Sequence, residues 1–208
     1  MAARSIIYVD GMNLYFGMVK QTPYRWLDLQ RLFERLRKDD DIQAIHYFTA
    51  IVTGAAQARQ MAYLQALATM PKVKVILGRF KTTHAKCSVP ACSYKGDRWF
   101  SLPEEKRTDV NIAVQMLDDA YQDRADRLVL VTGDSDLVPP VAMVKQRFPA
   151  KKVIVYVPAR DPVRGAAVEL RAAADAHRTL PMALVKVSQL PASLPDGRGG
   201  TITKPATW

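Results

Sequence analysis

Short apolar runs alternate with amphipathic segments along almost the whole chain. Five runs rich in β-branched and aromatic side chains have the pattern of strands buried on both faces: residues 5–9, 42–52, 73–77, 128–131 and 153–157. Between them, apolar side chains recur at helical spacing over residues 26–36, 61–68, 110–121 and 163–174, and another helix begins about residue 137. This alternation predicts an α/β, three-layer fold with a mainly parallel sheet of five to six strands.

The predicted domain covers residues 1–190. Within it, residues 81–103 lose their periodicity, and we expect an irregular basic excursion there. The helix over 110–121 carries one apolar stripe, which predicts the face that packs on the sheet: Val110, Ala113, Val114, Leu117 and Tyr121. Residues 191–208, with three prolines and three glycines, are expected to form a loose C-terminal extension.

Composition is that of an ordinary globular protein, except for its charge. The chain has 208 residues, of which 49% are hydrophobic, and no apolar run approaches the roughly 20 residues that span a bilayer. With no signal-peptide core, we expect a cytoplasmic protein without a membrane partner. The net charge is +10, and residues 71–107 hold nine Lys or Arg against three acids. This excess favours a polyanionic partner, although charge alone does not separate nucleic acid from a membrane surface.

Acidic side chains follow two of the predicted strands where each strand ends. Asp10 ends the first, with Asn13 one helical turn later, and Asp134 and Asp136 follow the run over 128–131. Asp109 precedes the stripe of the long helix. Each acid taken alone is explained by helix capping. If the two strands are neighbours at the point where strand order reverses, however, the acids converge there.

Clustered carboxylates repel one another unless a cation lies between them. An all-oxygen ligand set without His or Cys suits Mg²⁺ or Mn²⁺. Such an ion beside a basic surface is typical of phosphoryl chemistry, in which the metal activates water and stabilises charge on the phosphate.

Three segments carry a family resemblance: IYVDGMNL at residues 7–14, EKRTDV at 105–110 and VTGDSDL at 131–137. In this order, they resemble the signatures of the NYN domain family, in particular its LabA-like (DUF88) branch among the PIN-like nucleases. The resemblance extends from about residue 5 to 187. It implies a PIN-like fold and Mg²⁺- or Mn²⁺-dependent ribonuclease activity.

By the same resemblance, Asp10, Asp109, Asp134 and Asp136 would be metal-binding and catalytic acids. Asn13 would orient the site, and Thr132 or Ser135 would support it through hydrogen bonds. Many relatives carry another acid six residues after the position of Asp109, where this chain has Gln115. Because of that departure, the number of metal ions, one or two, stays open.

The basic excursion supplies the candidate contacts to RNA, which we expect to be single-stranded. They are Lys81, Lys86, Lys95, Arg98, Lys106 and Arg107. His84, Cys87 and Cys92 could supply three zinc ligands, but no fourth ligand is evident, and two free cysteines or a disulfide between them explain the same pattern.

Two alternative functions are open at this point. A non-catalytic RNA-binding regulator on a PIN-like fold would bind RNA without cutting it. A phosphatase of the haloacid-dehalogenase type would need an acid two residues after Asp10, and Met12 occupies that position. The sequence also leaves open a homo-oligomer, the RNA target, and endo- or exonucleolytic cutting.

Overall fold

A six-stranded parallel sheet forms the centre of the molecule. The computed structural model describes residues 2–160 and 168–208. Its strands lie in the order β3-β2-β1-β6-β7-β8, and every neighbouring pair is parallel. Their bounds are β1 Ala3–Asp10, β2 Asp40–Thr49, β3 Val73–Leu77, β6 Arg127–Val131, β7 Lys152–Val157 and β8 Ala176–Thr179. The predicted α/β fold class is confirmed, and β1 and β6 are neighbours at the switch point in strand order.

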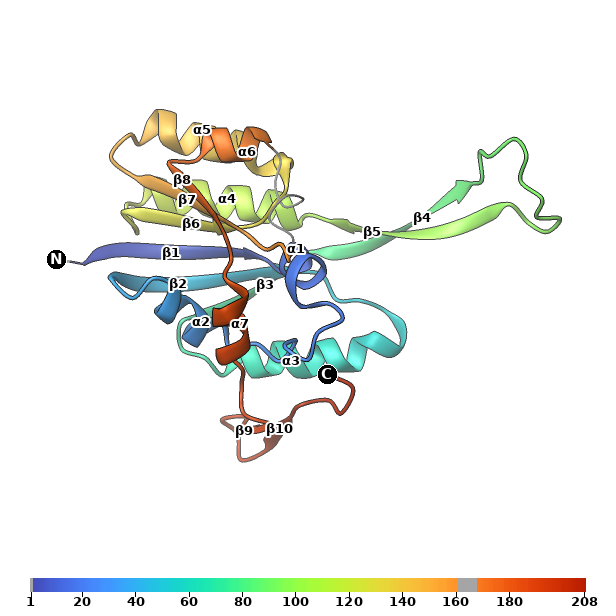
Figure 1. Ribbon diagram of the computed structural model, residues 1–208, viewed down its shortest axis with the longest axis horizontal. Helices are drawn as coiled ribbons and strands as arrows, with labels where there is room; N and C mark the ends of the chain where they lie inside the picture. The colour runs from blue at the N-terminus through green and yellow to red at the C-terminus, as the bar shows by residue number, and fades with distance from the viewer. Residues whose placement is uncertain (1, 161–167) are drawn as a thin grey trace.

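Helices cover both faces of the sheet (Figure 1). One face carries α4 (Thr108–Tyr121), α5 (Val138–Arg147) and α6 (Val168–Ala173), and the other carries α2 (Leu29–Leu36), α3 (Gln57–Ala68) and α7 (Met182–Val187). Alternate residues of β1 enter the two resulting cores: Ile6 and Tyr8 face α4, whereas Ile7 and Val9 face the opposite layer. Burial on both sides explains the continuous apolar runs of the sequence.

Short helical segments lie at the ends of strands. α1 (Gly11–Leu14) and the π-helical η1 (Tyr15–Val19) follow β1, the 3₁₀ segment η2 (Gly54–Ala56) precedes α3, and η3 (Ser135–Leu137) precedes α5. The Pro pair at 139–140 lies in the first turn of α5, where a missing N–H costs nothing. Of the helix expected over 163–174, residues 163–167 lie outside the described part of the chain.

The apolar stripe expected to pack α4 on the sheet is wrong for three of its five residues, whereas Leu117 does pack against the core. Val110, Val114 and Tyr121 are more than 60% exposed. The buried face consists instead of Ile112, Met116 and Ala120 together with the carboxylate of Asp119. The polar–apolar pattern fails here because the inward face includes Asp119, an acid that such a pattern assigns to the surface.

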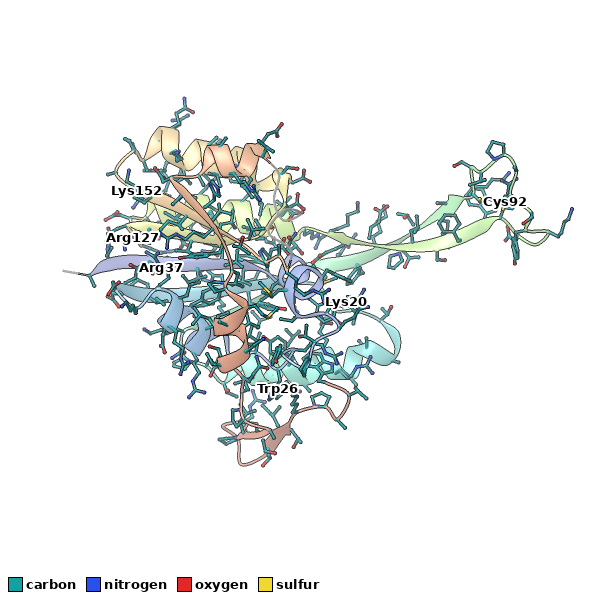
Figure 2. The ribbon with its side chains drawn as sticks, viewed as in Figure 1. Lys20, Trp26, Arg37, Cys92, Arg127 and Lys152 are labelled. Carbon is teal, nitrogen blue, oxygen red and sulfur yellow. The ribbon has the colours of Figure 1, made fainter. Side chains whose placement is uncertain are left out.

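The segment expected to be irregular forms a long β-hairpin. β4 (Arg79–Lys86) pairs antiparallel with β5 (Trp99–Lys106), and residues 87–98 form the connecting loop. The expectation of irregular structure is therefore wrong for the two strands. The hairpin extends away from the domain, with Cys92 near its free end (Figures 1 and 2). Most of its side chains are exposed on both faces, which removes the alternating pattern that normally reveals a strand.

The C-terminal extension is also ordered rather than loose. It contains the antiparallel pair β9 (Ser193–Pro195) and β10 (Thr201–Thr203). The Trp26 indole N–H donates to the Pro191 carbonyl at 2.8 Å, and the Trp208 ring lies 5.5 Å from that of Tyr63. Glycine and proline here mark tight turns in a packed segment.

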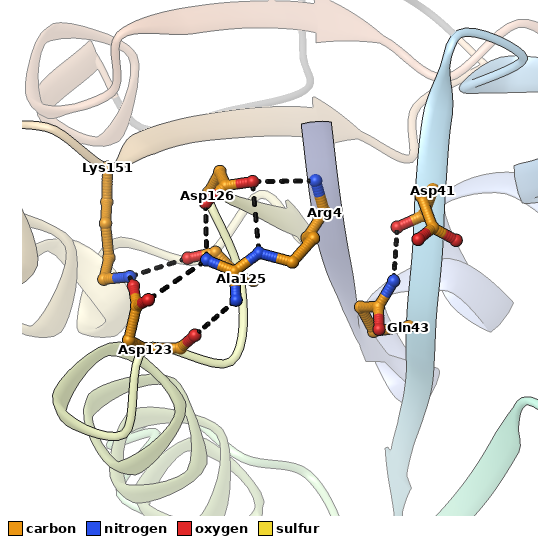
Figure 3. A network of polar contacts seen from close by, with 7 residues as sticks. All are labelled: Arg4, Asp41, Gln43, Asp123, Ala125, Asp126 and Lys151. Atoms are coloured by element: carbon orange, nitrogen blue, oxygen red, sulfur yellow. Dashed lines mark hydrogen bonds and ion pairs between the residues drawn. The ribbon is translucent and has the colours of Figure 1, made fainter. Parts of the chain in front are cut away.

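A polar network ties the beginnings of β1 and β6 together (Figure 3). The Arg4 guanidinium donates to both oxygens of Asp126 and to the side chain and carbonyl of Asp123, while Lys151 donates to Asp123 and the Ala125 carbonyl. These contacts lie at the edge of the sheet opposite the carboxyl ends of the strands. Within the described residues, no helix is both long and apolar enough to cross a membrane.

The buried hydroxyl of Tyr8 offers a test of the core beneath α4. It donates to Asp119 Oδ2 at 2.8 Å, and Asp119 also accepts from Arg124 and lies 3.7 Å from His46. We expect Tyr8→Phe to lower the free energy of unfolding by about 1–2 kcal/mol, because the carboxylate loses a buried partner. Urea unfolding would measure it. Tyr121→Phe, on a ring that is 63% exposed, is the matched control, and equal losses in both variants would contradict this account.

Candidate functional site

Asp10 is the buried acid at the centre of the candidate site. It is the last residue of β1 and is 4% exposed. Its carboxylate accepts the Asn13 backbone N–H at 2.9 Å, which caps α1, and the Thr132 hydroxyl at 2.9 Å. Burial raises the pKa of Asp10, and these two hydrogen bonds act in the opposite direction. The side chain is therefore held in one orientation.

One further hydrogen bond ties the exit of β6 to the exit of β1, and another fixes the β6 exit itself. The Gly133 N–H donates to the Asn13 side-chain carbonyl at 3.0 Å, and the Asp134 N–H donates to the Thr132 hydroxyl oxygen at 3.1 Å. Thr132 is fully buried and contacts both acidic residues. The structure thus places Asn13 and Thr132 where they fix the relative positions of Asp10 and Asp134.

Asp109 reaches the same place from the base of the hairpin. Arg107 has φ +79°, a left-handed conformation that turns the chain sharply from β5 into α4. The buried Thr108 then donates to Glu105, which places Glu105 beside Asp109. Gly78 packs beneath this turn, since a Cβ there would lie 2.6 Å from the Thr108 hydroxyl.

One hollow of about 270 Å³ brings these side chains together. It is lined by Asp10, Asn13, Glu105, Asp109 and Asp134, with Met12, Phe16 and Gly17. Burial, followed by the negative charges of Asp10, Asp134 and Asp136, raises the pKa of Asp109 to about 6. Burial also raises the pKa of Glu105, with Asp10 and Asp109 adding to it. We refer to this hollow as the acid pocket.

Asp136 and Ser135 lie at the rim of the acid pocket rather than in its lining. Both are exposed in η3, and the Asp136 backbone N–H donates to Asp134 Oδ1 at 3.0 Å. The charge of Asp136 is nevertheless close enough to raise the pKa of Asp109. Gln115 does not line the pocket at all. It lies two turns along α4 and donates to Asp119 at 3.1 Å.

The donor set of the acid pocket fits a hard divalent cation. All four acidic side chains offer oxygen ligands, and their mutual repulsion is the condition that a bound cation relieves. As they stand, no three His, Cys, Asp or Glu side chains in the described residues form a ready metal-binding group. Binding an ion here would therefore draw the carboxylates closer together.

Sequence reasoning missed Glu105 as a lining residue. It lies within the EKRTDV segment, so the available signal was its place four residues before Asp109. That signal indicates proximity only if a tight turn separates the two residues. The left-handed Arg107, which is not a glycine, gave no sequence indication of such a turn.

The basic side chains expected to contact RNA are distributed along the hairpin. Lys81, Lys86, Lys95 and Arg107 are exposed. Lys106 is exposed but pairs with Glu104 at 2.7 Å. The Arg98 guanidinium donates to the carbonyls of Cys87 and Val89 at 2.9 and 2.7 Å, so it holds the loop at the tip of the hairpin.

The cysteines lie near that tip, far from the acid pocket. Cys87 and Cys92 are both free thiols, and hydrogen bonds from the Val89 backbone and from Arg98 lower the pKa of Cys87. The His84 ring lies 3.4 Å from the Ser101 hydroxyl. The structure therefore places His84 in contact with β5.

The raised pKa of Asp109 has a measurable consequence. We expect its carboxyl ¹³C resonance to titrate with a midpoint near pH 6, against an ordinary value of 3.8. Because the folded state binds this proton more tightly than the unfolded chain, stability should fall as pH rises from about 4 through 6. Asp134→Asn should lower the midpoint by removing a neighbouring charge. Asp118→Asn, whose carboxylate pairs with Arg124, is the control, and an unchanged midpoint in Asp134→Asn would contradict the pocket geometry.

Comparisons with known proteins place this architecture in a family. The chain is 32% identical to the 6-hydroxy-3-succinoylpyridine 3-monooxygenase HspA of Pseudomonas putida, over 99% of this chain and 75% of that protein. A solved structure of a protein of unknown function from Vibrio parahaemolyticus shares the fold, with a TM-score of 0.54 and 24% identity over 86% of this chain and 94% of that one. The model of the NYN domain matches residues 4–181. The chain therefore belongs to the NYN domain family, within the PIN-like nuclease superfamily.

Proposed function

We propose that this protein is a metal-dependent ribonuclease that hydrolyses RNA phosphodiester bonds. The observation that carries the proposal is the acid pocket itself, in which three aspartates and a glutamate from three separate segments surround one hollow at the carboxyl ends of β1 and β6. Membership of the NYN family supports it, because that family lies among the PIN-like nucleases.

Asp10, Asp109 and Asp134 would hold Mg²⁺ or Mn²⁺, with Asp136 turning in from the rim. When bound, the ion supplies a Lewis acid for the phosphate and lowers the pKa of a coordinated water. The chain's own contribution is orientation: Thr132 and Asn13 fix the Asp10 carboxylate and the exit of β6. Glu105 lies beside Asp109 and adds a further acceptor at the pocket wall.

The phosphate backbone would be gripped by the exposed cations next to the pocket and along the hairpin. Arg107 forms the turn that leads to Asp109, and Lys81 and Lys86 lie farther out on β4. Contacts of this kind weaken as salt rises, because each releases a bound counterion.

Replacement of the pocket acids is the direct test. We expect Asp10→Asn and Asp109→Asn to lower cleavage of a labelled single-stranded RNA in Mn²⁺ by about 100-fold or more, because each removes a charge from the ion's shell. Asp118→Asn, on the exposed face of the same helix as Asp109, should cleave as fast as the unchanged protein. Product lengths would separate endo- from exonucleolytic cutting.

The same assay distinguishes the ribonuclease from the non-catalytic alternative. RNA binding without any metal-dependent product would favour an RNA-binding regulator. Cleavage that persists in EDTA, or at full rate in Asp10→Asn, would refute the assignment of the acid pocket.

A small-molecule oxygenase is the second candidate, because the relative HspA is named as a monooxygenase and is 32% identical over nearly the whole chain. If this chain shares that activity, it should consume dissolved oxygen when given 6-hydroxy-3-succinoylpyridine and a reduced nicotinamide cofactor. An oxygen electrode would measure this, with catalase present to correct for peroxide. A rate no higher than that with succinate in place of the pyridine would exclude the activity on this compound.

A further inference from the structure

A second cavity, lined by aromatic rings, lies beside the acid pocket. It has a volume of about 130 Å³, and Met12 and Phe16 line both hollows. Its walls come from α1 and η1, the end of β2, the start of α3 and the C-terminal residue: Tyr15, Tyr47, Tyr63 and Trp208 are the further aromatic side chains. A cavity of roughly 150 Å³ in a protein core accommodates benzene, so this one is of the size of a single six-membered ring.

The aromatic walls are fixed by contacts with one another and with nearby backbone carbonyls. Tyr63 donates its hydroxyl to the Leu27 carbonyl at 2.9 Å and meets the Tyr47 ring edge-on, at 6.1 Å and 90°. Trp208 lies 5.5 Å from Tyr63, and Arg25 donates to the adjoining Thr207 carbonyl at 2.8 Å. The cavity is therefore preformed, as ligand sites commonly are.

The Tyr47 hydroxyl is an unused hydrogen-bonding group at this cavity. Tyr47 is 7% exposed, and its hydroxyl bonds to no other described residue. Tyr47 lines the cavity, and its hydroxyl is accessible rather than fully buried. A Cβ on Gly11 would lie 2.7 Å from this hydroxyl, which places it one residue from Asp10. Since no described residue uses this hydroxyl, it is free to donate to a ligand in the cavity.

Arg59 supplies positive charge at the same cavity. Its side chain is partly exposed, lines the wall and forms no ion pair with the described residues. Arg25, by contrast, is tied to the Thr22 and Thr207 carbonyls. α3 begins beside Arg59 with no side-chain cap and no acid in its first turn, so the positive end of the helix dipole is not neutralised there.

We propose that this cavity binds a six-membered heteroaromatic ring that carries an anionic substituent. The ring lies among Tyr47, Tyr63 and Trp208, the Tyr47 hydroxyl donates to a ring oxygen or nitrogen, and Arg59 pairs with the anionic group. A free aromatic acid and a pyrimidine nucleotide of RNA share this chemistry. The proposal names a ligand class and holds whether or not the acid pocket cleaves RNA.

Ligand-observed NMR in EDTA tests binding separately from any metal chemistry. Nicotinate and uridine 5′-monophosphate are the probes for the two sources, and nicotinamide and cyclohexanecarboxylate remove the charge and the aromatic ring respectively. We expect at least one anionic ring probe to bind about tenfold more tightly than both of these controls. Nicotinate binding without the nucleotide identifies a free acid, and competition by the nucleotide identifies the RNA source. No binding by either probe would overturn the proposal.

Matched variants locate the site. Arg59→Met should weaken binding of the anionic probe by about tenfold and leave the affinity for nicotinamide unchanged, because only the charged contact is lost. Arg35→Met, at an exposed arginine of α2, should change neither. Tyr47→Phe should weaken the binding of both nicotinate and nicotinamide, because both lose the hydroxyl donor. Equal effects of Arg59→Met and Arg35→Met would overturn the assignment.

A measurement on the unchanged protein guards against variants that fold poorly. Saturating nicotinate or uridine 5′-monophosphate should shift the ¹⁵N–¹H signals of Gly11 and Gln60, which line the cavity, and leave that of Gly197, in the C-terminal hairpin, in place. Shifts confined to other regions would refute the site even if binding is observed.

Discussion

Parallel pairing of β1 with β6 is the constraint on which the site depends. The pairing sets Val9 opposite Val131, so the residues that leave the two strands, Asp10 and Thr132, emerge side by side at one edge of the sheet. Their hydrogen bond is formed in a dry environment, where such contacts are strong and an unpaired carboxylate is costly. The acids of the pocket are close because the backbone holds them there, against their own repulsion.

Much of the architecture could be predicted from the sequence, for a physical reason. A strand buried on both faces must be apolar throughout, and the runs over 5–9 and 128–131 have the composition and length of such strands. Glycine and acids after two such runs indicated one edge of a parallel sheet. The convergence of Asp10, Asp109 and Asp134 followed from that logic together with the family resemblance.

The predictions that were wrong, for the hairpin, the buried face of α4 and the C-terminal extension, have a different cause. An exposed hairpin has no core side, so β4 and β5 lack the alternation that signals a strand. On α4, the inward Asp119 is satisfied by Tyr8 and Arg124, partners more than a hundred residues away or beyond the end of the helix. Trp208 is packed by rings from two other segments. Each of these features depends on contacts that local sequence does not encode.

The hairpin also determines which charge stands at the wall of the acid pocket. Phe80 pairs with Glu105, and the neighbouring positions on β5 are Glu104 and Lys106. Side chains alternate between the two faces of a strand, so a slip of one residue in this pairing would turn Glu105 away and present a neighbour instead. One direction of slip would set the Lys106 ammonium group opposite Phe80, and the other would keep a carboxylate there. The charge that β5 presents at this wall is therefore a property of strand register as well as of the turn at Arg107, in a hairpin whose far end extends away from the domain.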